Sequence, residues 1–383
     1  MEPLMHASQS GAAAPDRNPF SYTMPMNPST PLIDRLLPAP VHGGFRMKDY
    51  WIWCGSVIRA DNPGEDGRYH MFASRWPRKL PFHPHWVFNC EVVRASSDTP
   101  EGPYVFEEVV LPRRGARFWD GMSTHNPTIR KIGGTYVLFY VGITYECDPP
   151  DPDRPETWIV GEKGRYHPLY LPTWMRKRTG IATSDRVAGP WLRCESPILQ
   201  NRSERWDATI ISNPAPCVRD DGRVYLLYKS SRIVPPGREA DLHFELGVAG
   251  ADHFEGPYRR LSEEPVFKFE NSSQHVEDPY LWYENGCFNC IMKDMTGELT
   301  GEWGAGIHAR SDDCIHWHLA DSPKAWSRTI RWDDGSTSFQ ANFERPQLLI
   351  QKGTPTHLFA ATGDGAKPWQ FQNTWNMCVP LRQ

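Results

Sequence analysis

The chain has 383 residues and lacks an excess of either charge, a long apolar run and a compact group of cysteines. Its 42 basic and 46 acidic residues give a net charge of −4, which offers no basic surface for nucleic acid. No stretch approaches the ~20 apolar residues of a membrane-spanning helix. We therefore expect neither nucleic acid nor a membrane among the partners of this protein.

The start of the chain has neither the positively charged segment nor the apolar segment of a secretory signal. We expect a cytoplasmic protein, or a periplasmic one if a signal has been removed. The nine cysteines, scattered from Cys54 to Cys378, do not form a disulfide framework. Cys287 and Cys290 form a C-x-x-C pair on an expected strand, where positions three apart point to opposite faces, so zinc or redox chemistry is not expected there.

The sequence does contain a repeated pattern: a polar residue before a proline, an apolar strand, a turn rich in Gly, Asn or Asp, and an aromatic strand. Copies occur at 124–140, 212–228, 274–293 and 343–360, and a copy without the proline lies at 50–73. Gly-Pro or Asp-rich turns before an aromatic outer strand follow at 97–104, 184–191, 252–258 and 311–317. Self-similar strand groups of this kind are typical of propellers.

The pattern predicts an all-β fold, a five-bladed β-propeller over residues 41–383, with a β-sandwich or several small β domains as the alternative. Residues 1–40 are rich in Pro, Ala, Ser and Met and are expected to form an irregular N-terminal arm. Such an arm packs along the propeller or reaches a second subunit in a homodimer. The insertion 145–178 carries six prolines and several aromatic residues, and we expect an ordered wall beside the active face.

The innermost strands of a propeller begin around one end of the central channel, so residues at these positions meet although they are far apart in sequence. The residues expected there are Asp49, His125, Asn126, Asn213, His275, Glu277, Asp278, Glu344 and Arg345. Two Trp-Asp pairs, Trp119-Asp120 and Trp206-Asp207, each lie six residues before an Asn-Pro pair. This repetition predicts that both loops descend into the same face.

Crowded carboxylates with His, Asn and Arg are suited to glycosidic cleavage, which needs one protonated acid and one carboxylate that activates water. Each candidate also has a structural interpretation, because an Asp before X-Pro can cap a turn and a histidine can pack inside the channel. Of the 16 Trp, some can stack on sugar rings and others can pack blades. The predicted catalytic residues are Asp49, Asp207, Glu277 and His275, the predicted substrate-binding residues are His125, Asn126, Trp206, Asn213, Asp120 and Arg345, and no metal ligand is predicted.

These motifs resemble the five-bladed propeller glycoside hydrolases of families 43 and 117. Glu277-Asp278-Pro279 lies at the place of the family 43 Glu-Gly-Pro motif, so the resemblance implies that Glu277 is the general acid. Asn213 replaces the blade-three aspartate of that family, and Trp53-Cys54-Gly55-Ser56 replaces its Ala-Asp-Pro-Ser. The run from His275 to Lys293-Asp294-Met295 is similar to family 117, the anhydro-galactosidases acting on agar oligosaccharides, which implies acids from blades one, three and four and a histidine proton donor.

We therefore predict an exo-acting, inverting glycoside hydrolase that cleaves a terminal sugar from a plant or algal oligosaccharide, with Asp49 or Asp207 as base and Glu277 or His275 as acid. No cofactor is expected to be required; a divalent cation in the central channel is the alternative, although no ligand spacing identifies one. A glycoside phosphorylase would need a basic phosphate pocket, for which Arg46, Arg205 and Arg345 are candidates. A non-catalytic sugar-binding propeller would keep the aromatic residues without using the acids.

Overall fold

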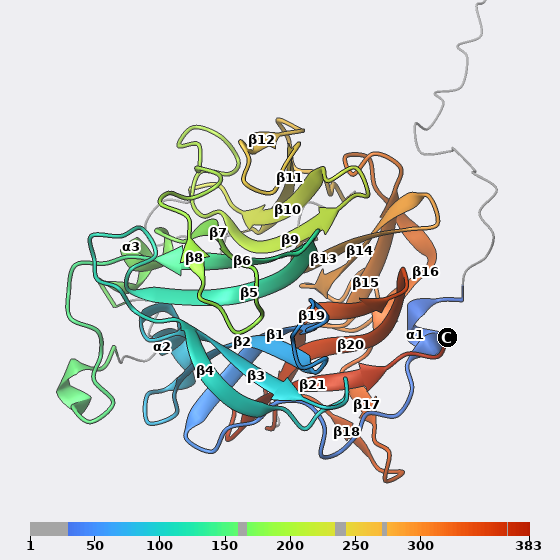
Figure 1. Cartoon of the computed structure of the whole chain (residues 1–383), viewed down its shortest axis with the longest axis horizontal. Helices are drawn as coiled ribbons and strands as arrows, with labels where there is room; N and C mark the ends of the chain where they lie inside the picture. Colours follow the sequence, from blue (N-terminus) through green and yellow to red (C-terminus); the bar gives the residue numbers. More distant parts are fainter. Residues whose placement is uncertain (1–29, 160–166, 234–242, 270–273, 366) are drawn as a thin grey trace, which may run out of the picture. The chain divides into compact units, whose positions relative to one another are not determined.

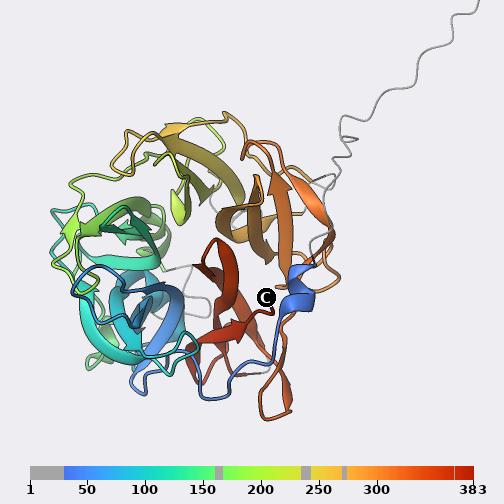
Figure 2. The same cartoon turned by 45° about the vertical axis from the view of Figure 1, so that its right-hand side comes forward.

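The computed structural model describes residues 30–159, 167–233, 243–269, 274–365 and 367–383. Within these ranges, five antiparallel sheets surround a common centre, as Figures 1 and 2 show. The first strands of the sheets contact one another in a closed ring, so they are the innermost strands. The predicted five-bladed β-propeller is confirmed.

Each blade follows the chain from its inner strand outward. Blade 1 contains β1 (Tyr50–Arg59), β2 (Tyr69–Pro77), β3 (Glu91–Ser97) and β4 (Val105–Leu111). Blade 2 contains β5 (Ser123–Ile132), β6 (Thr135–Ile143), β7 (Arg178–Ser184) and β8 (Leu192–Arg193). Blade 3 contains β9 (Ser212–Val218), β10 (Val224–Ser230), β11 (Glu245–Ala251) and β12 (Arg259–Arg260). Blade 4 contains β13 (Val276–Glu284), β14 (Cys287–Asp294), β15 (Gly306–Ser311) and β16 (His318–Trp326), and blade 5 contains β19 (Asn342–Gln351), β20 (Thr354–Gly363) and β21 (Thr374–Pro380).

The Gly-Pro turns before the outer strands were predicted from the sequence and are present. Gly102, Gly189 and Gly256 have φ values of 91°, 88° and 95°, a region that side chains with a Cβ rarely adopt. A small hairpin of β17 (Thr329–Arg331) and β18 (Thr337–Phe339) separates blades 4 and 5. All nine cysteines are free.

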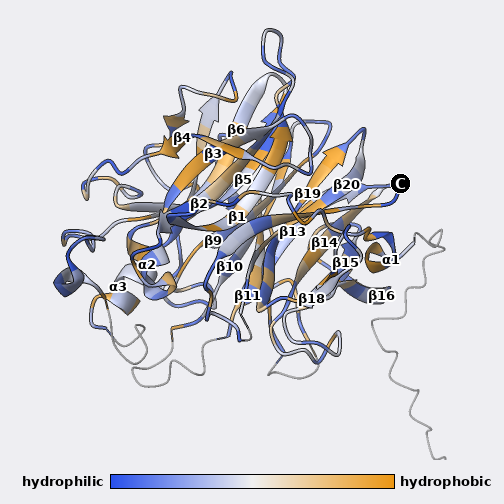
Figure 3. Ribbon diagram, turned by 90° about the horizontal axis from the view of Figure 1, so that it is seen from below, coloured by the Kyte–Doolittle hydropathy of each residue, from blue (hydrophilic) through white to orange (hydrophobic). Residues whose placement is uncertain are grey.

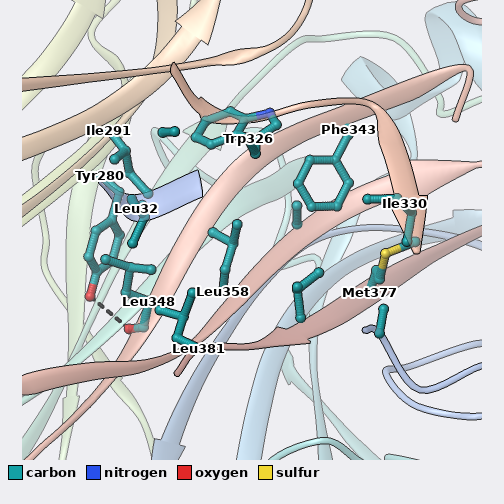
Figure 4. Packing of buried hydrophobic residues seen from close by; sticks show 14 of the residues in the cluster. Leu32, Tyr280, Ile291, Trp326, Ile330, Phe343, Leu348, Leu358, Met377 and Leu381 are labelled. Atoms are coloured by element: carbon teal, nitrogen blue, oxygen red, sulfur yellow. Dashed lines mark hydrogen bonds between the residues drawn. The ribbon is translucent and has the colours of Figure 1, made fainter. Parts of the chain in front are cut away.

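The core lies between neighbouring blades, where the apolar faces of successive sheets meet (Figure 3). Between blades 4 and 5, Tyr280 and Ile291 pack with Leu348, Leu358 and Phe343 (Figure 4). The Tyr280 hydroxyl donates a hydrogen bond of 2.8 Å to the Leu348 carbonyl, so this buried polar group is satisfied. The strands read as nearly continuous apolar runs because both of their faces are covered.

The described part of the predicted arm packs on blade 5. Helix α1 (Leu32–Arg35) contacts β16 and buries Leu32 in the cluster between blades 4 and 5, and Leu36 and Phe45 form bridges to Leu381 and to Asn376 of β21. This segment therefore supplies the outer edge of blade 5. Residues 1–29 lie outside the described residues, so the homodimer expected through the arm stays a prediction.

The insertion between β6 and β7 contains η1 (Pro155–Thr157) and helix α3 (Tyr170–Trp174), which contacts α2 (Phe82–Phe88). Trp174 and Tyr145 belong to one buried cluster with Phe88 and Val87, so the described part of the insertion is packed on the propeller. Among the described residues, no helix has the length and apolar character to cross a membrane.

Candidate active site

Every inner strand has a bulge at the same level of the propeller. The residue at each bulge has a positive φ although it is not glycine: Cys54, Asn126, Asn213, Asp278 and Arg345, with φ between 51° and 59°. The strand register shifts at each of these positions. Proline follows in four blades and Gly55 in the first. Backbone strain repeated at one level is typical of a functional centre.

The five bulge residues surround the axis as a ring, and hydrogen bonds link them in order from Cys54 to Arg345. The Cys54 thiol donates to Asn126 Oδ1 at 3.0 Å, Asn126 Nδ2 to Asn213 Oδ1 at 2.9 Å, and Asn213 Nδ2 to Asp278 Oδ1 at 2.7 Å. Arg345 Nη1 lies 2.9 Å from Asp278 Oδ1, and its backbone N–H donates to Oδ2 at 3.3 Å. The hollow inside this ring is about 20 Å³, the volume of roughly one water molecule. A sugar cannot pass through it.

Charged residues gather next to this ring, and we call them the mouth cluster: His125, Lys177, Lys229, Glu277, Lys293 and Glu344. Three of them directly precede a bulge residue on an inner strand, and Lys229 and Lys293 come from the second strands β10 and β14. The electrostatic fields of these groups act on one another across blades 2 to 5.

Glu277 and Lys229 form a buried ion pair, with 13% and 3% of their side chains exposed. Burial raises the pKa of Glu277, but the charges of Lys229, Lys293 and Arg345 outweigh burial and lower the pKa far below its ordinary value. Glu277 is therefore ionised, and it still reaches solvent.

Glu344 forms a second ion pair with Lys293, and these side chains are 4% and 1% exposed. Asn342 Nδ2 also donates to Glu344 Oε2 at 3.2 Å. Deeper in the ring, burial raises the pKa of Asp278 to about 6, with Glu277 and Glu344 adding to this effect and Arg345 opposing it. Each of these acids thus has a cationic neighbour, and Glu277 is the more exposed of the two glutamates.

Lys177 and His125 have a different environment. The Lys177 ammonium lies over the Trp86 and Trp174 rings, 4.9 and 4.2 Å from their centroids, and the residue is 1% exposed. Burial, Lys229 and Arg345 lower the pKa of Lys177 well below its ordinary value. His125 is buried against Trp86, at a ring distance of 5.4 Å, and its pKa is also lowered well below the ordinary value, mainly by burial.

An aromatic rim lies beside Lys293. Its Nζ is 5.0 Å from the Trp303 centroid and 5.3 Å from that of Trp369. Trp369 is 45% exposed and has a φ of 66°. Trp53 lies 6.4 Å from it, ring to ring. An exposed indole held in a strained backbone conformation is suited to stack on the apolar face of a sugar.

The structure brings most of the predicted polar residues together. Glu277, Asn126, Asn213, Arg345 and His125 belong to the ring or to the mouth cluster. His275 is nearby, because its ring lies 6.4 Å from that of Phe244, whose face is 4.2 Å from Lys229 Nζ. The His243 ring is 5.1 Å from His275.

The two Trp-Asp pairs lie inside their blades instead. Asp207 is fully buried and accepts hydrogen bonds from Arg202 at 2.9 Å, Arg260 at 2.6 Å and the Tyr228 hydroxyl at 3.0 Å, while Trp206 stacks on Tyr228. Among the described residues, it shares no partner with Glu277.

Asp120 repeats this arrangement in blade 2, with Arg114, Arg193 and Tyr140, and Trp119 stacks on Tyr140. The duplicated motif therefore joins the inner loop of a blade to its outer strand. Asp49 is exposed at the start of β1, and its carbonyl accepts a hydrogen bond from the Arg78 amide.

Four residues of this region, Lys177, Lys229, Lys293 and Trp369, were not predicted from the sequence. Lys229 and Lys293 each stand one position before the end of a largely apolar strand, and a charge at that position is a signal of a buried partner. In the described part of the chain, no group of three or more His, Cys, Asp or Glu residues could hold a metal ion. The guanidinium of Arg345 also lies in the ring, so these residues do not fit a channel cation.

Neither a protein-family model nor a curated protein sequence matches the chain. Solved structures do match. A family 117 glycoside hydrolase from the marine bacterium Zobellia galactanivorans is 15% identical, with a TM-score of 0.59 over 91% of this chain and 89% of that one. A structure described as a glycoside hydrolase is 14% identical, with a TM-score of 0.60 over 90% of both proteins. A thermostable family 43 glycoside hydrolase is 11% identical, with a TM-score of 0.55 over 90% and 92%. The predicted likeness to these families is confirmed for the fold.

Proposed function

We propose that this protein is a glycoside hydrolase that removes a terminal sugar at the mouth cluster. The observation that carries the proposal is Glu277, a carboxylate that its cationic neighbours keep ionised and that remains 13% exposed beside a closed channel. A second buried glutamate and an exposed tryptophan lie in the same region. The named glycoside hydrolases among the structures that share the fold support this assignment.

The closed ring supports an exo mode of action. Because the hollow along the axis holds about one water molecule, a polysaccharide chain has no exit through the propeller. A substrate that enters along the axis would therefore stop at the mouth cluster with its end, which favours removal of a terminal sugar. Trp369, at the rim, would stack on the terminal sugar or its neighbour.

In the proposed mechanism, Glu277 acts as the base rather than the acid. Its carboxylate takes a proton from water, the water oxygen attacks the anomeric carbon, and the glycosidic C–O bond breaks. The His275 imidazolium gives a proton to the leaving oxygen. A single displacement of this kind inverts the anomeric configuration. Asp49 and Asp207, which the sequence suggested as bases, are not needed in this scheme.

A glycoside phosphorylase is the second candidate, because the mouth cluster is rich in cations. Of the three arginines suggested from the sequence, Arg345 belongs to this region, whereas Arg46 stacks on Trp375 with 4.7 Å to the ring centroid. A phosphorylase would cleave only when inorganic phosphate is present. A hydrolase would work equally well without it.

The test is a panel of neutral and acidic plant and algal oligosaccharides, with and without phosphate, read by ¹H NMR for the first anomer released. We expect phosphate-independent release of one terminal sugar with inversion. Glu277→Gln should reduce the rate by about 10²- to 10⁴-fold. The matched control is Glu284→Gln, at the other end of β13, where Glu284 accepts a bond from Trp282 Nε1 at 3.1 Å. Sugar binding without cleavage by the wild type would contradict the proposal.

A further inference from the structure

Lys177 lies between helix α3 and strand β7 and is almost fully buried, with 1% of its surface exposed. In the described part of the chain its ammonium group faces two tryptophan rings and has no carboxylate partner. A cation–π contact recovers part of the hydration that a lysine loses on burial. It does not replace a counter-ion.

The charges of the mouth cluster show why Lys177 differs from its neighbours. Among the described residues, Lys229 pairs with Glu277, Lys293 with Glu344, and Arg345 with Asp278. Lys177 forms no ion pair of this kind with a described residue, although the charges of Glu277 and Asp278 act on it, and the three lysines of the cluster outnumber its two glutamates. Burial lowers the pKa of Lys177, because a charged ammonium group without a partner is unfavourable there. The ammonium group is therefore held less tightly to its charged form in the free protein than an exposed lysine would be.

Two further buried polar atoms in the same region lack partners within the described residues. His125 Nε2 has no hydrogen-bond partner, and the residue is 3% exposed. Arg345 Nε is also unpaired. His125 and Lys177 both contact Trp86, so a single ligand between them could satisfy both groups. Buried polar groups are rarely left without partners unless a ligand or water completes them.

We infer that the substrate is an acidic sugar whose anionic group pairs with Lys177 while a hydroxyl of the same sugar bonds to His125 Nε2. The anionic group is a carboxylate or a sulfate ester. This inference rests on the proposed function, since it defines the substrate class of the same site. The tryptophans on either side of the ammonium would hold the anion away from water, which strengthens a charge-assisted bond.

The experiment uses the full-length protein and measures binding by calorimetry and by tryptophan fluorescence. The probes are galacturonic acid, galactose 6-sulfate, neutral galactose and inorganic phosphate. We expect wild-type protein to prefer at least one acidic sugar over galactose by about 10- to 150-fold, the range of a bond to a charged group. Inorganic phosphate should bind more weakly than the acidic sugar, because it can pair with Lys177 but lacks the sugar hydroxyl that bonds to His125. Such weak binding would support the inference.

Lys177→Met is the informative variant, because methionine keeps the length of the side chain without its charge. It should remove the preference for acidic sugars and leave galactose binding unchanged. It should also be at least as stable as wild type without ligand, because it deletes an unbalanced buried charge. Lys79→Met is the control, since that lysine is 66% exposed and pairs with Asp153 on the surface.

The outcomes separate this inference from the hydrolase proposal. Lys177-dependent binding of acidic sugars without any cleavage would support the inference and overturn the hydrolase. Cleavage of neutral and acidic substrates at equal rates, in the wild type and in Lys177→Met alike, would overturn the inference and keep the hydrolase. Equal loss of acidic and neutral binding in Lys177→Met, or a preference for phosphate over every sugar, would also overturn it.

Discussion

The ion pair between Lys229 and Glu277 can be tested by a double-mutant cycle. Lys229→Met removes the ammonium that lowers the pKa of Glu277, and Glu277→Gln removes the charge that balances Lys229. Both side chains are mostly buried, at 3% and 13% exposure, so neither partner can be fully rehydrated. Breaking one side of a buried pair typically costs about 3 to 5 kcal/mol.

We place each single variant at the lower end, about 3 kcal/mol of lost stability, because Lys293 and Arg345 still act on Glu277 in the absence of Lys229. The double variant should also lose about 3 kcal/mol, rather than the sum, because Lys293 and Arg345 still lose the attraction of the Glu277 charge although Lys229 no longer lacks a partner. The coupling energy is then about 3 kcal/mol. Guanidinium unfolding at pH 7, with midpoint and slope both fitted, measures it.

The coupling should depend on pH in one direction only. The pKa of Glu277 is lower in the folded than in the unfolded state, so the pair stabilises the protein above the unfolded pKa of about 4.3. The stabilisation should be the same at pH 7 and pH 5 and decrease as the pH falls below about 4. A coupling energy under about 0.5 kcal/mol at pH 7, the value of an exposed pair, would refute the buried ion pair.

The remaining predictions concern the rim and the blades. Trp369→Ala should raise KM about two- to tenfold with little change in kcat, because an aromatic stacking contact is worth about 0.5 to 1.5 kcal/mol. Steady-state kinetics on the substrate found in the panel measures both constants. A fall in kcat without a change in KM would contradict this prediction. Asp207→Asn and Asp120→Asn should each destabilise the protein by about 3 to 5 kcal/mol, because Arg260 or Arg193 loses its buried partner. Thermal unfolding tests this, and a loss below about 1 kcal/mol would show that these acids do not hold the blades.

The fold was predictable because the sequence repeats its strands, its turns and its X-Pro pairs in register. The same pairs also mark the ring, since the residue before each proline is the bulge residue that faces the axis. Glu277 could be found because it stands one position before such a residue. The repeated local pattern was therefore sufficient to predict both the fold and the position of Glu277.

Other residues could not be placed from local pattern. The Trp-Asp pairs were expected at the channel because they precede Asn-Pro, but Asp207 is bonded to Arg260, 53 residues later, and only the tertiary structure shows this. Lys229 and Lys293 are the second-to-last residues of strands whose sequences resemble those of buried core strands. Trp369 lies in the loop between β20 and β21. The sequence of this loop has no repeating pattern from which the position of Trp369 could be predicted.

The central claim is that the chemistry depends on Glu277 at the mouth cluster. The most direct measurement compares kcat/KM and unfolding midpoints of Glu277→Gln, Asp207→Asn and Asp49→Asn on one cleaved oligosaccharide. We predict that Glu277→Gln loses about 10²- to 10⁴-fold in kcat/KM, that Asp207→Asn mainly lowers stability, and that Asp49→Asn changes neither. Full activity in Glu277→Gln together with loss of activity in folded Asp49→Asn would contradict the account.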